Sequence, residues 1–165
     1  MRVVGIDFGN RRIGIAVSDA TGTLARPVLT LDVRGDAAHA VALVGDAIVT
    51  LERDDEPVGA IVVGLPRRLD GSANAQTPIV EAFAARLRQQ SGRTVVLQDE
   101  RLTSHQADQL LAVRERDWRV RKQKLDAAAA AVILQEYLDA RPPSPSATAA
   151  QEGGNPEPGP PLSRG

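Results

Sequence analysis

The order of apolar and polar residues along the chain predicts strands first and helices afterwards. Residues 3–6 and 13–17 are apolar runs rich in β-branched side chains, and the Gly9-Asn10 pair between them is typical of a turn. Together they predict a hairpin at the centre of a sheet. Residues 24–31 predict a third strand, in which Pro27 indicates an edge position or a bulge.

The rest of the pattern alternates between helical and extended segments. The first of these are a helix over 36–52 capped by Asp36, a continuous apolar strand over 58–63 and a polar loop over 64–76. A helix follows with Thr77 as N-cap and Pro78 at its first position, and then a strand over 94–97. A capping box at Thr103 and Gln106 opens the next helix, and the last helix covers 125–139. Three strands followed by β-α-β units predict an α/β fold with a five-stranded mixed sheet and helices on both faces. The first strand should be central, with the fourth and fifth parallel to it on one side.

Composition separates a folded domain from a tail. Residues 141–165 contain seven of the 11 prolines and almost no large apolar side chain. Burial there is too small to offset the entropy that ordering would remove. We therefore expect a single domain over residues 1–140 and a disordered Pro/Gly-rich tail over 141–165.

Cysteine content and charge narrow the chemistry further. The sequence has no cysteine, which excludes disulfides, cysteine-ligated zinc and thiol nucleophiles. The net charge of −1 gives no overall attraction to nucleic acid, so any such contact must come from a local basic patch. With no leader and no apolar run near the ~18 residues of a membrane span, we expect a soluble cytoplasmic protein.

Three carboxylates should meet at one edge of the predicted sheet. Asp7 ends the first strand, where an ionised group among apolar residues is unfavourable unless something pairs with it. Glu100 ends the fifth strand, and Asp126 lies in the first turn of the last predicted helix. The carboxyl ends of parallel strands share an edge, and clustered carboxylates suit Mg²⁺ or Mn²⁺. Two such ions roughly 4 Å apart are the usual arrangement for in-line displacement at phosphorus.

Each carboxylate also has a purely structural interpretation. Backbone amides of the turn could hold Asp7. Glu100 could form a salt bridge with Arg101 or Arg93, and Asp126 could favour the start of a helix through the helix dipole. The catalytic interpretation rests on all three acids coinciding.

Four motifs, in order over residues 1–140, resemble those of the YqgF/RuvX family. They are Gly5-Ile6-Asp7-Phe8-Gly9 with Arg12-Ile13-Gly14-Ile15-Ala16, Val63-Gly64-Leu65-Pro66 with Asp70-Gly71-Ser72, Asp99-Glu100-Arg101-Leu102-Thr103-Ser104, and Lys124-Leu125-Asp126-Ala127-Ala128-Ala129 with Ile133-Leu134-Gln135. The resemblance implies a ribonuclease H-like fold and assigns the catalytic, metal-binding acids to Asp7, Glu100 and Asp126. The family is described as a pre-16S rRNA nuclease and, earlier, as a Holliday junction resolvase.

The resemblance therefore implies a metal-dependent endonuclease that uses Mg²⁺ or Mn²⁺ and acts on structured nucleic acid. Processing of the pre-16S rRNA 5′ end during ribosome biogenesis is the leading hypothesis, with a ribosomal particle as a candidate partner. Resolution of four-way DNA junctions is the alternative. A resolvase needs two sites acting together and hence a stable homodimer, whereas an rRNA-processing enzyme can be a monomer. The residues leave the choice between RNA and DNA open.

Basic and polar residues near the same edge are the candidate nucleic-acid contacts, which would position phosphates rather than read bases. They are Arg11, Arg12, Arg67, Arg68, Arg101, Thr103, Trp118, Arg119, Arg121, Lys122 and Lys124. Helical periodicity is lost over residues 112–124, and the basic cluster over 114–124 predicts a mobile loop that orders on the substrate. In that loop Trp118 either stacks on a base or anchors the loop to the core.

Two other classes of function share parts of the pattern. Actin-like and sugar-kinase ATPases carry the same Asp-x-Gly hairpin, here Asp7-Phe8-Gly9, but they need two such domains and this sequence has one. A non-catalytic RNA-binding module would gain nothing from clustered carboxylates that face phosphates. A nuclease accounts for both the acids and the basic residues around them.

Overall fold

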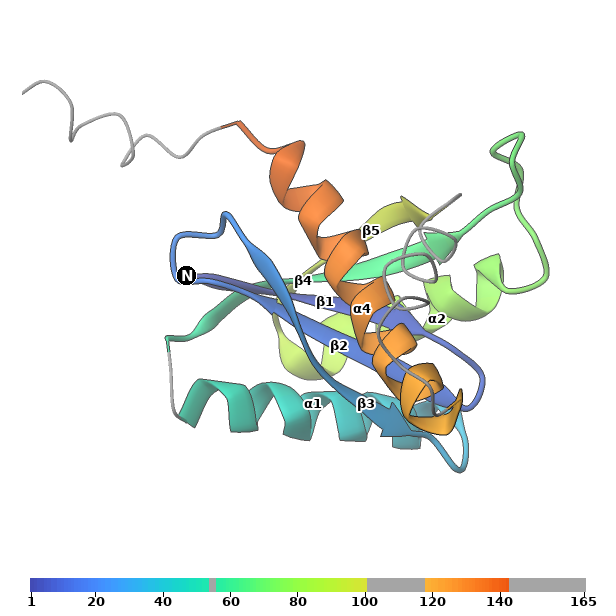
Figure 1. Ribbon diagram of the computed structural model, residues 1–165. Coiled ribbons are helices and arrows are strands. Elements are labelled where there is room, and N and C mark those ends of the chain that lie inside the picture. The colour runs from blue at the N-terminus through green and yellow to red at the C-terminus, as the bar shows by residue number, and fades with distance from the viewer. Residues whose placement is uncertain (54–55, 101–117, 143–165) are drawn as a thin grey trace, which may run out of the picture.

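The computed structural model describes residues 1–53, 56–100 and 118–142, with the backbone alone over 118–123. These residues form a five-stranded sheet and three helices (Figure 1). The elements are β1 (Arg2–Phe8), β2 (Arg12–Ser18), β3 (Ala25–Asp32), α1 (Ala37–Arg53), β4 (Val58–Pro66), α2 (Thr77–Ser91), β5 (Thr94–Glu100) and α4 (Trp118–Asp139). The strand order β3-β2-β1-β4-β5 confirms the prediction that the first strand is central.

Strand directions bring three carboxyl ends to one edge of the sheet. Strands β4 and β5 run parallel to β1, whereas β2 is antiparallel to β1 and β3 is antiparallel to β2. The edge at which β1, β4 and β5 end is therefore also the edge at which β2 begins, and we call it the site edge. This five-stranded mixed sheet with its helices confirms the α/β fold class predicted from the sequence.

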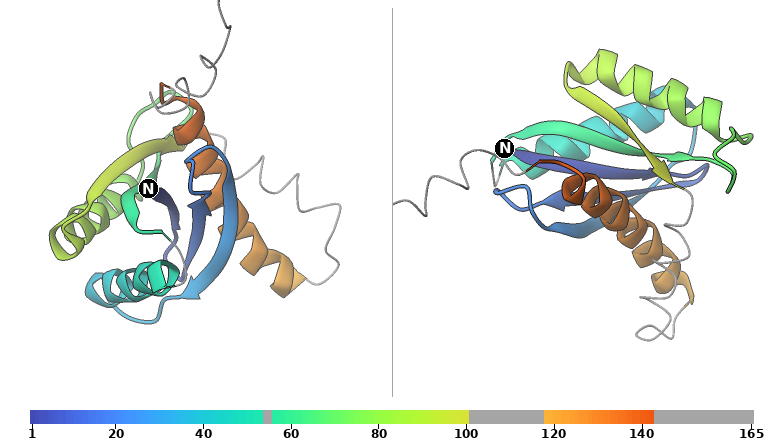
Figure 2. Two further views of the ribbon diagram at one scale, coloured as in Figure 1. Left: turned by 90° about the vertical axis from the view of Figure 1, so that its left-hand side faces the viewer. Right: turned by 90° about the horizontal axis from the view of Figure 1, so that it is seen from above.

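Helices cover both faces of the sheet (Figure 2). Because side chains alternate along a strand, Val4 and Ile6 of β1 face the core shared with α1 and α2, and Val3 faces α4. Helix α4 crosses β3, β2 and β1 on its own face. The helices on both faces that the sequence predicted are confirmed.

Two glycines of the sheet let α4 come unusually close to the strands. A Cβ at Gly5 would lie 2.7 Å from Cβ of Leu134, and a Cβ at Gly14 would overlap the backbone carbonyl of Asp126. Neither space can hold even a methyl group. These glycines therefore fix how deeply α4 sits, and with it the position of Asp126.

The third strand has both features expected from its proline. Strand β3 lies at the edge of the sheet. Its register shifts between Ile15 and Ala16 of β2, which pair with Leu29 and Pro27. Proline cannot donate a backbone hydrogen bond, and an edge position with an irregularity tolerates that loss.

The start of α2 differs from the prediction. Gln76 is the N-cap residue, so Pro78 is the second helical residue rather than the first. The Oδ1 atom of Asn74 accepts hydrogen bonds from the backbone N–H groups of Gln76 (2.9 Å) and Thr77 (3.1 Å). The Thr77 hydroxyl donates to the carbonyl of Pro66 (2.6 Å). Asn74 therefore supplies the cap that Thr77 was expected to supply.

The last helix begins earlier than predicted. Helix α4 starts at Trp118, so residues 118–124 are helical and the predicted loop is wrong for that part. Arginine, lysine, glutamine and leucine have high intrinsic helix propensity, which the missing apolar periodicity concealed. Asp126 consequently lies well inside the helix, and its expected place in a first turn is wrong.

Two strands are longer than predicted, and part of the chain is not described. Strands β4 and β5 run to Pro66 and Glu100, because the two strands continue to pair to those residues. The predicted loop therefore begins at Arg67. The predicted helix at Thr103, the basic residues before Trp118 and almost all of the predicted tail lie outside the described residues. In the part of the chain that is described, no helix is long and apolar enough to cross a membrane.

Candidate active site

Asp7 and Glu100 meet on the face of the sheet that α4 covers. A Cβ at Gly64 would lie 2.8 Å from Oε2 of Glu100, so the Glu100 carboxylate lies over Gly64. In the parallel β1–β4 register Ile6 pairs with Val63, which puts Gly64 beside Asp7. The two acids are therefore neighbours across β4, as the sequence predicted.

Asp126 reaches the same place from α4. Its backbone carbonyl lies against Gly14, which pairs directly with Asp7 in the β1–β2 hairpin. Residues from β1, β5 and α4, up to 119 positions apart in the numbering from 7 to 126, thus converge at the site edge. The predicted meeting of the three carboxylates is what this geometry supports.

The environment of Asp7 strongly disfavours its charged form. Its pKa is raised from 3.8 to about 8, first by burial of the carboxyl and then by the charges of Glu100 and Asp126. No backbone amide of the described residues donates a hydrogen bond to the Asp7 carboxyl, so the turn does not hold it. A buried acid whose pKa is raised by two other acids is typical of a functional site.

The structural alternatives for the other two acids fail where the structure tests them. Arg93 pairs with Glu52, at 2.7 Å from its Nη1 to Oε1, and lies just before β5, whereas Glu100 ends that strand. Asp126 is far from the first turn of α4, so the dipole of that turn does not explain it. Arg101, the other candidate partner of Glu100, lies outside the described residues.

Arg12 pairs with Asp126 across the site. Its Nε donates a hydrogen bond of 2.7 Å to Oδ2 of Asp126. Both side chains are mostly buried, with 26% and 23% of their surface exposed. In this structure the guanidinium of Arg12 lies against one of the acids, and the phosphate contact expected of it stays a prediction.

The donor set fits a divalent cation. Carboxylate oxygens are hard ligands, and a cation next to Asp7 would remove the repulsion that raises its pKa. In the arrangement seen here, however, no three acidic or histidine side chains among the described residues are grouped so that they could hold one ion. The acids are close enough to interact, but Asp126 is engaged with Arg12.

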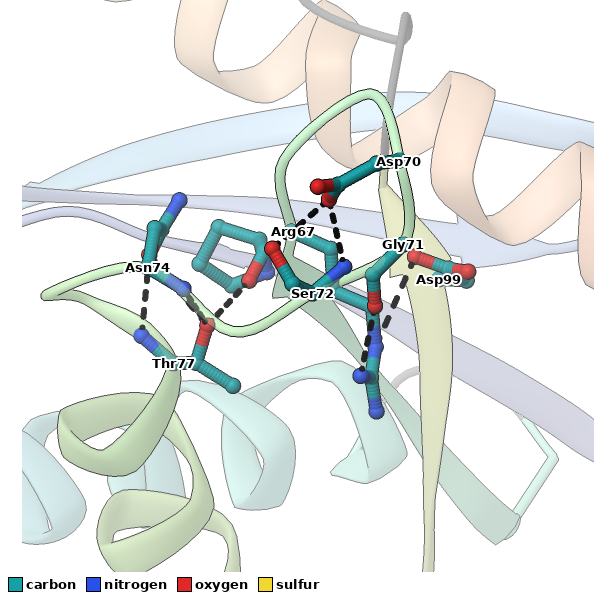
Figure 3. Close-up of polar contacts among 8 residues, drawn as sticks. Arg67, Asp70, Gly71, Ser72, Asn74, Thr77 and Asp99 are labelled. Carbon is teal, nitrogen blue, oxygen red and sulfur yellow. Dashed lines mark hydrogen bonds and ion pairs between the residues drawn. The ribbon is translucent and has the colours of Figure 1, made fainter.

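Arg67 is engaged within the loop that follows β4 (Figure 3). Its Nη1 donates to the carbonyl of Gly71 at 3.1 Å, and its Nε lies 3.8 Å from Oδ1 of Asp99. Ser72 is held in turn by Asp70 through its backbone N–H and its hydroxyl, at 2.8 Å and 2.6 Å. Arg67 thus stabilises the loop between β4 and α2, Arg68 beside it is exposed, and the phosphate contacts expected of both stay predictions.

The remaining predicted contacts are placed only in part. Arg11 is exposed beside the hairpin turn, and Lys124 is exposed on α4, two residues before Asp126. Trp118, Arg119, Arg121 and Lys122 lie on α4, but their side chains are not described. Arg101 and Thr103 lie outside the described residues.

Sequence reasoning missed the packing that positions the acids. Gly14 and Gly64 were recognised as motif residues, but not as the places where α4 and Glu100 lie against the sheet. The sequence did contain a signal. Gly5 and Asp7 are two positions apart and so lie on the same face of β1, and Gly14, which pairs with Asp7, lies on that face of β2. A glycine inside a strand is a recognised mark of close approach.

Known proteins resemble this chain over most of its length. A protein-family model described as "RuvX: Holliday junction resolvase" matches residues 1–140. A protein of Anaeromyxobacter dehalogenans (strain 2CP-C), named "Putative pre-16S rRNA nuclease", is 42% identical over 143 residues, which cover 87% of this chain and 100% of the relative. A protein of the same name from Geobacillus thermodenitrificans (strain NG80-2) is 36% identical over 141 residues, covering 86% and 99%.

Similarity to solved structures is more distant. The structure of T. thermophilus RuvC in complex with Holliday junction substrate is 18% identical, with a TM-score of 0.46, over 81% of this chain and 91% of RuvC. Likeness at this level bears on neither substrate nor mechanism. The family match and the two relatives are sufficient in themselves: this chain belongs to the RuvX family.

Proposed function

We propose that this protein is a divalent-metal-dependent endonuclease that hydrolyses phosphodiester bonds in the precursor of 16S rRNA. The observation that carries the proposal is the convergence of Asp7, Glu100 and Asp126 at the site edge, with the pKa of Asp7 raised to about 8. Clustered acids are unfavourable for folding, so a site that keeps them needs a cation to bind. Membership of the RuvX family supports the same chemistry.

The chain supplies the groups that bind the cation and the substrate backbone. Bound Mg²⁺ or Mn²⁺ would activate water and stabilise the leaving oxygen during in-line displacement. Asp7, Glu100 and Asp126 would hold the cation through their carboxylate oxygens, and the proton of the Asp7 carboxyl would pass to solvent on binding. Exposed Arg11 and Arg68 lie at the same edge and are placed to position phosphates.

The substrate is inferred from the relatives. Two relatives that align over 99–100% of their own length are named for pre-16S rRNA. The description of the family model favours a second candidate, a four-way DNA junction, which the same three acids would serve. Paired symmetric nicks in a junction require two copies of the site, so this candidate predicts a stable homodimer.

A cleavage assay separates these substrates. Wild type, Asp7→Asn and Asp46→Asn are each incubated with Mg²⁺ or Mn²⁺ and one of three substrates at matched salt: a precursor-rRNA end fragment, a four-way DNA junction, or a ribosomal particle carrying the precursor. Asp46 is exposed on α1, on the opposite face of the sheet, and serves as the matched control. Binding of each substrate is measured in parallel.

We expect metal-dependent cutting of the precursor by wild type and Asp46→Asn and none by Asp7→Asn, with binding of the RNA retained or improved. Cutting of the precursor only within the ribosomal particle would mean that the particle has to present the RNA to the enzyme. Cutting of the junction alone would replace the RNA substrate with DNA. Failure of wild type on all three substrates, or equal loss of binding and cutting in Asp7→Asn, would contradict the proposed function.

A further inference from the structure

Arg12 has a fixed backbone and a side chain already engaged within the site. Arg12 is the first residue of β2, and its carbonyl accepts a hydrogen bond of 2.9 Å from the backbone N–H of Gly9. In the antiparallel β2–β3 register its backbone lies opposite that of Asp32. From this anchored position the guanidinium crosses to α4 and donates to Oδ2 of Asp126 at 2.7 Å. The sheet therefore fixes the backbone of Arg12, and the ion pair with Asp126 fixes the position of its guanidinium.

Two observations describe how Asp126 lies relative to the other two acids. Asp126 lies near enough to Asp7 for its charge to act on that carboxyl. Yet among the acidic side chains that the structure describes, no three are grouped so that they could hold one ion. The Asp126 carboxylate is thus beside the other two acids but oriented towards Arg12.

We propose that Arg12 is a positioning residue that holds the Asp126 carboxylate away from Asp7 and Glu100 until a substrate phosphate binds its guanidinium. Released from Arg12, Asp126 joins the other two acids as a cation ligand. The proposal rests on the proposed function and deepens it, because it makes metal binding depend on the presence of substrate. Arg12 would then bind Asp126 in the absence of substrate and the phosphate predicted from the sequence in its presence.

The chemistry of the pair allows this exchange. The pair is mostly buried, so Arg12 would leave Asp126 only for another anion, and guanidinium binds phosphate oxygens as readily as carboxylate oxygens. Loss of the contact returns a full negative charge to the acids, which strengthens cation binding. Since coupling between two binding sites is reciprocal, metal must also tighten binding of the phosphodiester backbone.

The test is a metal titration without turnover. Mn²⁺ is titrated by calorimetry into wild type, Arg12→Gln and Arg86→Gln, with and without a phosphorothioate oligoribonucleotide that resists cleavage. Arg86 is exposed on α2, on the opposite face of the sheet, and serves as the matched control. Without the oligonucleotide, we expect Arg12→Gln to bind Mn²⁺ about tenfold more tightly than wild type, a factor typical of coupled sites. Arg86→Gln should match wild type.

Two further variants guard against a merely structural effect. Arg12→Lys keeps a charge that can pair with Asp126, and should bind Mn²⁺ as wild type does. In an Asp126→Asn background, Arg12→Gln should change Mn²⁺ affinity very little, because the contact it removes is already lost. The oligonucleotide should tighten Mn²⁺ binding to wild type and leave Arg12→Gln unchanged.

The outcomes separate this inference from the function beneath it. Weaker Mn²⁺ binding by Arg12→Gln would show that Arg12 presents Asp126 to the metal, and equal binding would show that the ion pair has no influence. Either result would contradict the role proposed for Arg12 without contradicting the proposed nuclease function. If wild type and every variant fail to bind Mn²⁺ with the oligonucleotide present, the metal-dependent nuclease falls as well.

Discussion

The two faces of the sheet differ in how closely a helix backbone approaches the strands. The face under α1 and α2 is filled by large residues, including Ile6, Ile48 and Leu87, each about 1% exposed or less. The face under α4 also buries large residues, Ile133 and Leu134 among them, but small residues lie where the helix is closest: Gly5 lies against Leu134, and Ala130 is fully buried. The α4 face therefore brings a helix backbone close to the strands, and Figure 2 shows the helices on the two faces.

This difference separates stability from chemistry. Large buried side chains contribute free energy roughly in proportion to the area they cover, and any close-packed arrangement would serve. The α4 face must also place the Asp126 carboxylate relative to Asp7, and misplacement of a catalytic group by about 1 Å can reduce a rate about 100-fold. Substitutions on the two faces should therefore have different consequences.

The largest effect should come from Gly14→Ala, on the α4 face. The added methyl would overlap the backbone carbonyl of Asp126, which cannot rotate away, so α4 must shift. We expect cleavage to fall at least ~100-fold and stability to fall by about 1–3 kcal/mol, measured by initial rates and by denaturant unfolding.

The matched control is Gly45→Ala in α1, where a Cβ meets nothing within 4 Å. It should stabilise the protein by up to about 1 kcal/mol, because alanine is the better helix former, and leave cleavage unchanged. Normal cleavage by Gly14→Ala would mean that the depth of α4 does not position Asp126.

An intermediate effect is expected from Leu87→Ala on the opposite face. Leu87 lies in the core between α2 and the sheet and is 1% exposed, so truncation should lower the free energy of unfolding by about 2–5 kcal/mol. Below its melting temperature the variant should cut at the wild-type rate and bind Mn²⁺ with unchanged affinity. If folded Leu87→Ala also cut more slowly than wild type, the two faces would not differ in their effect on catalysis.

The smallest effect should follow truncation after Ala140. The prediction that residues 141–165 are a disordered tail remains a prediction, and it implies that neither face of the sheet depends on them. The melting temperature and the cleavage rate of the truncated chain should equal those of the full chain. A clear drop in melting temperature would show that the tail packs on the domain.

Local patterns were sufficient to predict most of the fold. The strand order followed from the sequence of elements and the rule that parallel crossovers are right-handed, and Pro27 marked the edge strand. Asp7 stood out because a carboxylate ends an apolar strand, where its ionisation is unfavourable. Each of these signals spans a few residues and needs no knowledge of the rest of the chain.

Features that depend on distant contacts could not be predicted in the same way. The pairing of Arg12 with Asp126 joins residues 114 positions apart, and Arg67 donates a hydrogen bond to the carbonyl of Gly71 and forms an ion pair with Asp99. The start of α4 was missed for a different reason: intrinsic propensity extended the helix through residues that show no apolar face. Candidate site residues could thus be proposed from local patterns, whereas the contacts that they form across the fold could not.

Melting curves across pH test most directly whether Asp7 is a desolvated acid beside two others. The folded state keeps the Asp7 proton up to about pH 8, whereas the unfolded chain releases it near 3.8. Between these values the folded state binds more protons, so this group lowers stability as pH rises. Asparagine does not titrate, so Asp7→Asn removes that loss.

Wild type and Asp7→Asn should therefore melt at nearly the same temperature at pH 4 in EDTA. The variant should become the more stable by roughly 2–4 kcal/mol near pH 8, with no further gain above it. Added Mg²⁺ should raise the melting temperature of wild type and narrow the difference. Equal melting temperatures at every pH, or a less stable Asp7→Asn at pH 8, would contradict the clustered-acid site.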